Sequence, residues 1–555
     1  MILFTLMLMT ILIPMVGLAI DGTKAFIIKA KLSTAVDGGA IAAANMLSAG
    51  ANAADQAASA AATGKQFVKA NFPAGTWGSQ LQAGQPSICV DNGDGSDPCG
   101  LGTAGQVGAY KVRNVVISAR ADVPLWFLRI FGLSSTSVAA SGRASRRDSR
   151  VVLVIDRSTS MGNKIDDVKL HAQEFVDRFA PNRDEVGLVV FGGSAIVAYP
   201  ARDATKDPTD PASFSPPDKN FYPKVRNLIG QIKSTSNTGM AEALYLAYQT
   251  LKADAATNPE VQYKMNAIVL FTDGLPNGIT AQFNRTGENW VSSSSCNYRA
   301  NSAAFPSSTA MVGWFAQWNG FKDDTDGARG LLQPMMITPY QGYTGRGDDI
   351  DKWMSGKDYP NDDEKVTSMA QGCNCAKTDA SGNPTRKLAP DLAKLPTHDL
   401  YWNSTTRVGW NGLNPGTGDD SMYKNSYIYQ NFGKRSQNIN AANNSYQVGL
   451  ASWNATADQA WKIWNDKYYD KNDAVAPIKT DTHPISPVIF TIGYYNGAGA
   501  EAPDQTLMKI ISNTEDSPVS VAPDKIHGKM YYTTSTSQVG NAFAEIASEI
   551  LRIAQ

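Results

Sequence analysis

The chain has 555 residues, of which 43% are hydrophobic and 18% are charged, a balance typical of globular rather than disordered proteins. This length is enough for roughly two to four domains that each bury their own core. The formal net charge is -1 and no basic block is present, so a bulk electrostatic attraction to nucleic acid is excluded.

The first twenty residues are apolar or small, and the first charged residue is Asp21. At about 1.5 Å per residue, a helix over 1–20 spans roughly a 30 Å hydrocarbon core, so we predict a membrane span there. The alternative is a cleaved signal peptide, but no basic segment precedes the apolar run. Lys24, Lys29 and Lys31 follow it, and a strict positive-inside count would place the body in the cytoplasm. Since long domains translocate largely regardless of flanking charge, we predict that the body lies outside the cytoplasm.

After the span, apolar residues recur every three or four positions, which predicts a helix that continues to about residue 48. Its apolar face consists of Ile28, Leu32, Val36, Ala40, Ala43 and Leu47. Between residues 108 and 144 the apolar period shortens towards two, which predicts strands of a small sheet that the helix could cover.

Two of the five cysteines, Cys89 and Cys99, bracket a loop rich in Gly and Asp and could close a disulfide. The other three, Cys296, Cys373 and Cys375, lie far downstream, and one thiol is left over unless chains pair. The acids of the bracketed loop, at positions 91, 94 and 97, do not follow EF-hand spacing, so we interpret the loop as a turn rather than a calcium site.

From residue 149 onwards, buried strands alternate with amphipathic helices, which predicts an α/β fold with a doubly wound, mostly parallel sheet. The predicted strands are 151–156, 185–192 and 266–274, and the predicted helices are 164–179, 225–232 and 239–251. The alternation stops and then resumes with a strand at 487–495, a helix near 505–513, a strand at 529–534 and a helix at 539–554. We therefore predict one domain formed by 149–278 and 484–555 and interrupted by a large insertion at 279–483, whose role the sequence does not reveal.

The insertion holds nine of the eleven tryptophans and is too aromatic for a flexible linker. For seven of these we expect packing in a core rather than an aromatic platform for a ligand. They are Trp314, Trp318, Trp402, Trp410, Trp453, Trp461 and Trp464. The sequence contains no GxxxxGK[ST], GxSxG, HExxH or CxxC motif, so we predict that the protein is not an enzyme, with an enzyme site inside the insertion as the remaining alternative.

In doubly wound sheets, ligands bind at the carboxyl ends of the parallel strands. Several oxygen-bearing side chains of this sequence lie at the ends of the predicted strands. Asp156, Ser158 and Ser160 leave one strand end, Asp273 leaves another, and Thr238 precedes a helix on the same rim. An all-oxygen set suits a hard divalent cation, with Mg²⁺ preferred and Ca²⁺ or Mn²⁺ possible. With few carboxylates, the ion would keep enough charge to accept a carboxylate from a partner. The plainer interpretation is that the serines cap the next helix.

These five residues resemble the metal-ion-dependent adhesion site (MIDAS) of von Willebrand factor type A domains, which consists of an Asp-x-Ser-x-Ser turn, a distant Thr and an Asp after a later strand. The resemblance covers roughly 149–278 and 484–555, and it implies a Rossmann-like fold. It also implies that Ser158, Ser160 and Thr238 bind the cation directly or through water, while Asp156 and Asp273 bind it or hold its waters.

The N-terminal segment resembles TadG-like proteins of the Flp, or tight-adherence, pilus machinery, in which an apolar span leads into an alanine-rich helix. The matching residues are Asp21, Leu32, Ala35, Asp37, Ala40, Ala42 and Ala43, whereas Gly38 and Gly39 depart from the pattern. The resemblance implies a bacterial, single-pass inner-membrane protein with a pilin-like α+β region at 21–148 and its body in the periplasm or at the cell surface. Its expected function is pilus assembly or cell adhesion through a protein partner, either a pilus component or a surface ligand; a surface adhesin unrelated to pili is the alternative.

Overall fold

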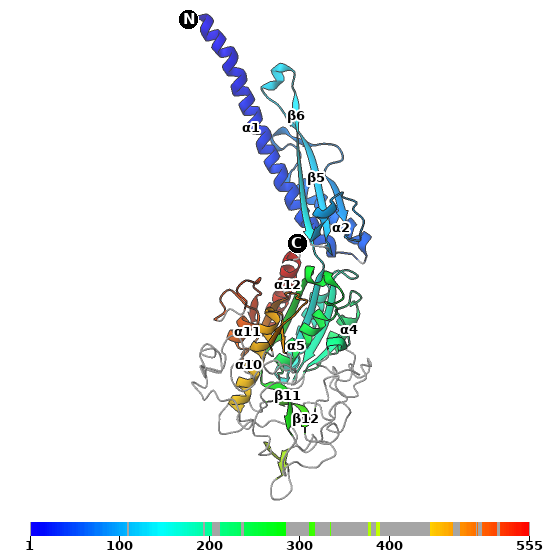
Figure 1. Cartoon of the computed structure of the whole chain (residues 1–555). Coiled ribbons are helices and arrows are strands. Elements are labelled where there is room, and N and C mark those ends of the chain that lie inside the picture. The colour runs from blue at the N-terminus through cyan, green and yellow to red at the C-terminus, as the bar shows by residue number, and fades with distance from the viewer. Residues whose placement is uncertain are drawn as a thin grey trace. The chain divides into compact units, whose positions relative to one another are not determined.

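A computed structural model describes residues 2–50, 52–107, 110–192, 195–201, 211–234, 238–284, 310–316, 333–334, 376–378, 384–388, 445–469, 478–495, 497, 502–518 and 522–553. The chain divides into two compact units (Figure 1). The N-terminal unit consists of 1–148, 180–183 and 551–555, and the C-terminal unit consists of 149–179 and 184–550.

The N-terminal unit begins with the long helix α1 (Ile2–Asn45), which continues as a 3-10 turn at Met46–Ser48. All six residues of the predicted apolar face are at most 1% exposed, so the continuation of the helix to residue 48 is confirmed. Among the residues that the structure describes, no helix has the length and hydropathy of a membrane span. The span expected at 1–20 is therefore not confirmed.

The small sheet predicted between residues 108 and 144 is also present; it is antiparallel and includes two strands before that range. It consists of β1 (Gln80–Leu81), β2 (Ser87–Asp91), β5 (Arg113–Pro124) and β6 (Ser135–Arg146), with β5 paired to the other three. The short strands β3 (Gln106–Val107) and β4 (Tyr110–Lys111) pair separately. Helix α1 runs along the β5–β6 hairpin (Figure 1), and alternate β5 residues join its apolar face in one core. These are Val115, Ile117, Ala119, Ala121 and Val123.

A second helix, α2 (Ala53–Asn71), is not predicted by the sequence analysis, and it explains why glycine interrupts the alanine pattern of α1. A Cβ atom on Gly39 would lie 2.6 Å from Val68 Cγ2, and one on Gly64 would lie 3.1 Å from Ala43 Cβ. Small residues at these positions let the two helix backbones approach closely. The departure from the family pattern at Gly39 is thus a packing requirement.

Replacing Gly39 by leucine should lower the free energy of unfolding of the N-terminal unit by about 1–3 kcal/mol, because the new side chain overlaps α2. Gly22→Leu is the matched control, since no atom lies within 4 Å of a Cβ at Gly22 on the same helix. Hydrogen exchange of the β5 amides in the full chain reports the difference. Equal protection in the two variants would contradict the close approach of the helices.

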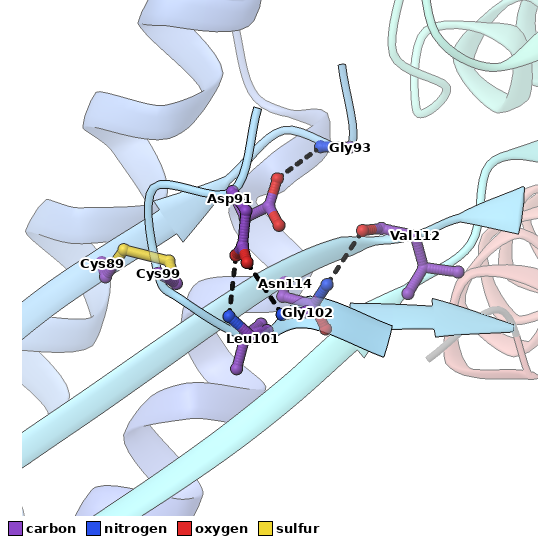
Figure 2. Close-up of a disulfide and its surroundings, with 9 residues drawn as sticks. Cys89, Asp91, Gly93, Cys99, Leu101, Gly102, Val112 and Asn114 are labelled. Atoms are coloured by element: carbon purple, nitrogen blue, oxygen red, sulfur yellow. Dashed lines mark hydrogen bonds between the residues drawn. A yellow bond between two sulfur atoms is a disulfide. The ribbon is translucent and has the colours of Figure 1, made fainter. Parts of the chain in front are cut away.

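The predicted disulfide between Cys89 and Cys99 is present, with Cα atoms 5.8 Å apart (Figure 2). The acids of the loop accept hydrogen bonds from the loop's own backbone: Asp91 from Gly93 N (2.9 Å) and Asp97 from Leu101 N (2.7 Å). This agrees with a turn rather than a calcium site. The remaining three cysteines lie outside the described residues.

The C-terminal unit is built on a six-stranded sheet with the order β19-β18-β10-β7-β8-β9. Its strands are β7 (Ser149–Asp156), β8 (Glu185–Phe191), β9 (Ala195–Tyr199), β10 (Met265–Thr272), β18 (Val488–Tyr494) and β19 (Met530–Thr533). All neighbours are parallel except β8 and β9. The mostly parallel sheet is confirmed, and the antiparallel edge strand β9 is an addition to the prediction.

Helices pack on this sheet where the alternating pattern predicts them. They are α3 (Ile165–Val176), α4 (Lys224–Gln231), α5 (Met240–Lys252), α11 (Gln505–Ile511) and α12 (Thr536–Ile553). Phe543 of α12 lies against Phe175 of α3 and Phe271 of β10, with ring centroids 5.5 and 6.1 Å away. These contacts join the end of the chain to the first half of the domain.

Parts of the region between β10 and β18 are described. They are β11 (Gly278–Asn284), β12 (Ala310–Ala316), β13 (Gln333–Pro334), β14 (Ala376–Thr378), β15 (Pro384–Leu388), α10 (Ser445–Trp464), β16 (Lys467–Tyr469) and β17 (Ile478–Thr480). Helix α10 packs against α5 and α11. Trp453 and Trp464 are buried, and their indole N–H groups donate to Asp504 Oδ2 (3.2 Å) and Ile511 O (2.7 Å). The expected core packing is confirmed for these two; Trp461 is half-buried, and the other four side chains lie outside the described residues.

Candidate metal site

Two neighbouring parallel strands bring the predicted acidic residues together. Strand β7 ends at Asp156, and β10 ends one residue before Asp273. The strands are in register, with Ile155 opposite Phe271, so both acids leave the same edge of the sheet. A short 3-10 helix (Thr159–Lys164) follows β7 almost directly. Ser158 precedes this helix and Ser160 lies within it, and the tight backbone directs both side chains towards β10.

The serines after β7 bond to both acidic residues. Ser158 Oγ and Ser160 Oγ are 2.9 Å apart, and they donate to Asp273 Oδ1 at 3.1 and 2.7 Å. Asp156 Oδ1 accepts from the backbone N–H of Ser158 at 2.7 Å, and its Oδ2 accepts from Thr272 Oγ1 at 2.6 Å. Four of the five predicted site residues therefore form one connected group.

Thr238, the fifth residue, lies beside this group in the loop before α5 and is 3% exposed. A Cβ atom on Gly274 would lie 3.6 Å from Thr238 Oγ1 and 3.8 Å from Ser160 Oγ, so both hydroxyls border the same glycine. The Thr238 backbone N–H donates to Asn277 Oδ1 at 2.8 Å, which fastens this loop to the segment after β10.

Both carboxylates of the group are buried, and burial raises the pKa of each. Burial and, after it, the nearby charge of Asp273 raise the pKa of Asp156 to about 7, while hydrogen bonds from Thr272 and Ser158 oppose the shift. Burial also raises the pKa of Asp273, against hydrogen bonds from Ser160 and Ser158 and the charge of Lys164.

One oxygen of the group stands apart: Asp273 Oδ2 is buried and accepts no hydrogen bond from the residues that the structure describes. A buried carboxylate oxygen without a donor is costly, and a cation would satisfy it. The donor set of two carboxylates and three hydroxyls therefore fits a hard divalent ion better than zinc or copper. Within the described ranges, no cluster of three or more His, Cys, Asp or Glu offers an alternative site.

Sequence reasoning missed three residues that position this group. Thr272 bonds Asp156, Asn277 holds Thr238, and Ser234 Oγ donates to the Ser158 carbonyl (2.8 Å) while accepting from Gly162 N (3.0 Å). Thr272 directly precedes Asp273 at the end of a predicted strand, so its position could have predicted that it lies in the site. Ser234 and Asn277 act on segments distant in sequence, and no local pattern marks them.

The fold and a family comparison define the class of the C-terminal unit. A family model described as a von Willebrand factor type A domain matches residues 151–275, and a model described as Flp pilus-assembly TadE/G-like matches residues 1–46. The chain therefore carries a von Willebrand factor type A domain preceded by a TadE/G-like pilus-assembly region. No curated protein is significantly similar to the chain.

The solved structures that match the chain include several proteins of bacterial pili. The von Willebrand factor domain of the type V pili tip protein Mfa5 from Porphyromonas gingivalis is 16% identical, with 74% of this chain and 98% of that chain covered and a TM-score of 0.31. The PilB minor pilin from Streptococcus sanguinis is 11% identical (86% and 80% covered, TM-score 0.32). The adhesive tip pilin GBS104 from Group B Streptococcus agalactiae is 12% identical (84% and 75% covered, TM-score 0.31).

Proposed function

We propose that this protein is a membrane-anchored component of a tight-adherence pilus system that binds a protein partner through a divalent cation. Asp156, Ser158, Ser160, Thr238 and Asp273 hold the cation, with Mg²⁺ as the preferred ion. The cation accepts a carboxylate from the partner, which is a pilus component or a surface ligand. The role is binding rather than catalysis, and the N-terminal helix anchors the chain by a single pass in the inner membrane with its body in the periplasm or at the cell surface.

The observation that carries this proposal is the buried, unpaired Asp273 Oδ2 next to a second buried carboxylate. Three hydroxyls contribute oxygens but no charge, so an ion that a carboxylate holds through a water rather than directly keeps part of its positive charge. A cation in this state attracts one more anionic ligand. The TadE/G-like match at 1–46 supports pilus assembly as the setting of this binding.

Calorimetric titration of Mg²⁺, Ca²⁺ and Mn²⁺ into the full chain in detergent tests the cation site. Ser158→Ala/Ser160→Ala should weaken binding by at least about tenfold, because two ligand oxygens are lost. Ser118→Ala/Ser141→Ala is the matched control: it removes an exposed hydroxyl pair 3.0 Å apart in the other unit. Undiminished binding in the Ser158/Ser160 variant would place the cation elsewhere.

A further inference from the structure

The loop between β5 and β6 exposes an unusual amount of apolar surface. Five of its side chains are between 37% and 77% exposed: Trp126, Phe127, Ile130, Phe131 and Leu133. They follow one another within eight positions at the tip of a hairpin. Contiguous exposed aromatic and aliphatic side chains of this kind mark an interaction surface in a folded protein. We call residues 124–133 the hairpin tip.

The hairpin tip is fixed to α1 at the point where the apolar N-terminal run ends. The Asp21 carboxylate accepts three backbone N–H groups of the tip, from residues 126, 127 and 128, at 2.8–2.9 Å. Lys24 Nζ donates to Pro124 O at 2.7 Å and lies 4.1 Å from the centroid of the Trp126 ring. The first two charged residues after the apolar run are therefore used to hold the hairpin tip.

Close packing at Gly17 places the tip beside the apolar run itself. A Cβ atom on Gly17 would lie 2.7 Å from Phe127 Cβ, so the tip contacts α1 from position 17 to position 24. Figure 1 shows the hairpin extending along α1 with its tip towards the N-terminal end of the helix.

Beside the hairpin tip, between positions 12 and 20, the exposed apolar side chains of α1 are distributed widely around the helix axis. Leu12, Met15, Val16, Leu18 and Ile20 are between 38% and 64% exposed. At about 100° per residue they cover an arc of roughly 200° around the helix, and the hairpin tip occupies the remaining side. A partner helix or groove covers an apolar stripe of about 100°. The exposed apolar arc of α1 is twice as wide, which fits a helix that is surrounded by lipid on this side.

We propose that the hairpin tip is a membrane-interface element that inserts its apolar side chains into the lipid surface next to α1. Its composition suits that position, because a tryptophan ring has an apolar body and a polar N–H, as the interface requires. The exposed Arg129 lies in the same tip, where its guanidinium can reach lipid phosphates. The tip and α1 then contact the bilayer as one surface, held together by Asp21.

This inference rests on the membrane anchoring in the proposed function, and one experiment separates the two. The full chain is reconstituted into liposomes of phosphatidylethanolamine and phosphatidylglycerol (about 3:1) that contain a traceable lipid. A photo-crosslinking residue is placed by Phe131→p-benzoylphenylalanine. The control is Trp77→p-benzoylphenylalanine, because Trp77 belongs to the same unit and has similar exposure, 56% against 62% for Phe131.

Both variants should float with the liposomes, and crosslinking to lipid should be at least about tenfold greater from position 131 than from position 77. Flotation with equal or negligible lipid crosslinking at position 131 would overturn the membrane-interface role and leave the anchor intact. Crosslinking of position 131 to a second copy of the chain, without lipid, would do the same and would show that the tip binds protein. A chain that stays out of the lipid fraction would overturn the anchor and this inference together.

Discussion

Asp273→Asn is expected to weaken Mg²⁺ binding by at least about 100-fold and, in the same protein, to stabilise the cation-free domain. Binding weakens because the unpaired Oδ2 and half of the negative charge of the site are lost. Stability rises because the variant no longer buries two carboxylates side by side, which burial and mutual repulsion oppose. An asparagine carbonyl can still accept the Ser158 and Ser160 hydrogen bonds.

These opposite effects distinguish a cation site from a structural hydrogen-bond network. In a network that serves only stability, removal of the carboxylate would weaken the fold. Calorimetric titration gives the affinity, and urea unfolding in EDTA gives the stability. Asp166→Asn is the control: it removes a carboxylate that is 75% exposed on α3 and should change neither quantity appreciably. Loss of stability in Asp273→Asn with unchanged Mg²⁺ affinity would contradict the proposal.

Stability of the cation-free domain should fall as the pH rises from about 4 to about 7. The pKa of Asp156 is raised from 3.8 to about 7 in the folded protein, so the folded state binds more protons than the unfolded state between these values. Stability therefore decreases with pH across this window and levels off above pH 7. One pKa unit corresponds to about 1.4 kcal/mol, so the expected loss is on the order of a few kcal/mol.

Saturating Mg²⁺ should remove this loss, because the cation favours the ionised carboxylates. The stabilisation by Mg²⁺ is then larger at pH 8 than at pH 5.5, since protons compete with the cation at the lower pH. Urea midpoints at both pH values, with EDTA or with Mg²⁺, measure the difference, and titration of groups remote from the site cancels in that comparison. An equal Mg²⁺ effect at both pH values would show that no carboxylate with a raised pKa binds the ion.

The sequence contained the main elements of the fold because their signals are local. The face from Ile28 to Leu47 has helical spacing, and the strands at 151–156 and 266–274 are continuous apolar runs bounded by polar turns. Helix α2 was missed because only one side of it is buried, by close contact with glycines of α1, and such contact leaves no apolar periodicity. Strand β9 was missed because its partner β8 runs antiparallel, which the alternation of strands and helices does not predict.

The sequence predicts some residues of the candidate site more directly than others. Asp156, Ser158 and Ser160 are close in sequence, and the end of a parallel strand fixes their position. The structure brings Asp273 to them because β10 is the neighbour of β7, a pairing that the order of strands along the chain does not specify. The unpaired oxygen of Asp273 depends on three-dimensional burial and could not be read from residue types.

The order of the strands also constrains when this domain can fold. Ala267 of β10 pairs with Val488 of β18, about 220 residues later, so the sheet is incomplete until the intervening chain has been made. At about 5–20 residues per second, synthesis of that length takes roughly ten to forty seconds. During this time β7 can pair with β10, but the other edge of β10 has no strand to pair with. An exposed parallel edge is prone to association with other chains, so this protein should depend on chaperones during its synthesis.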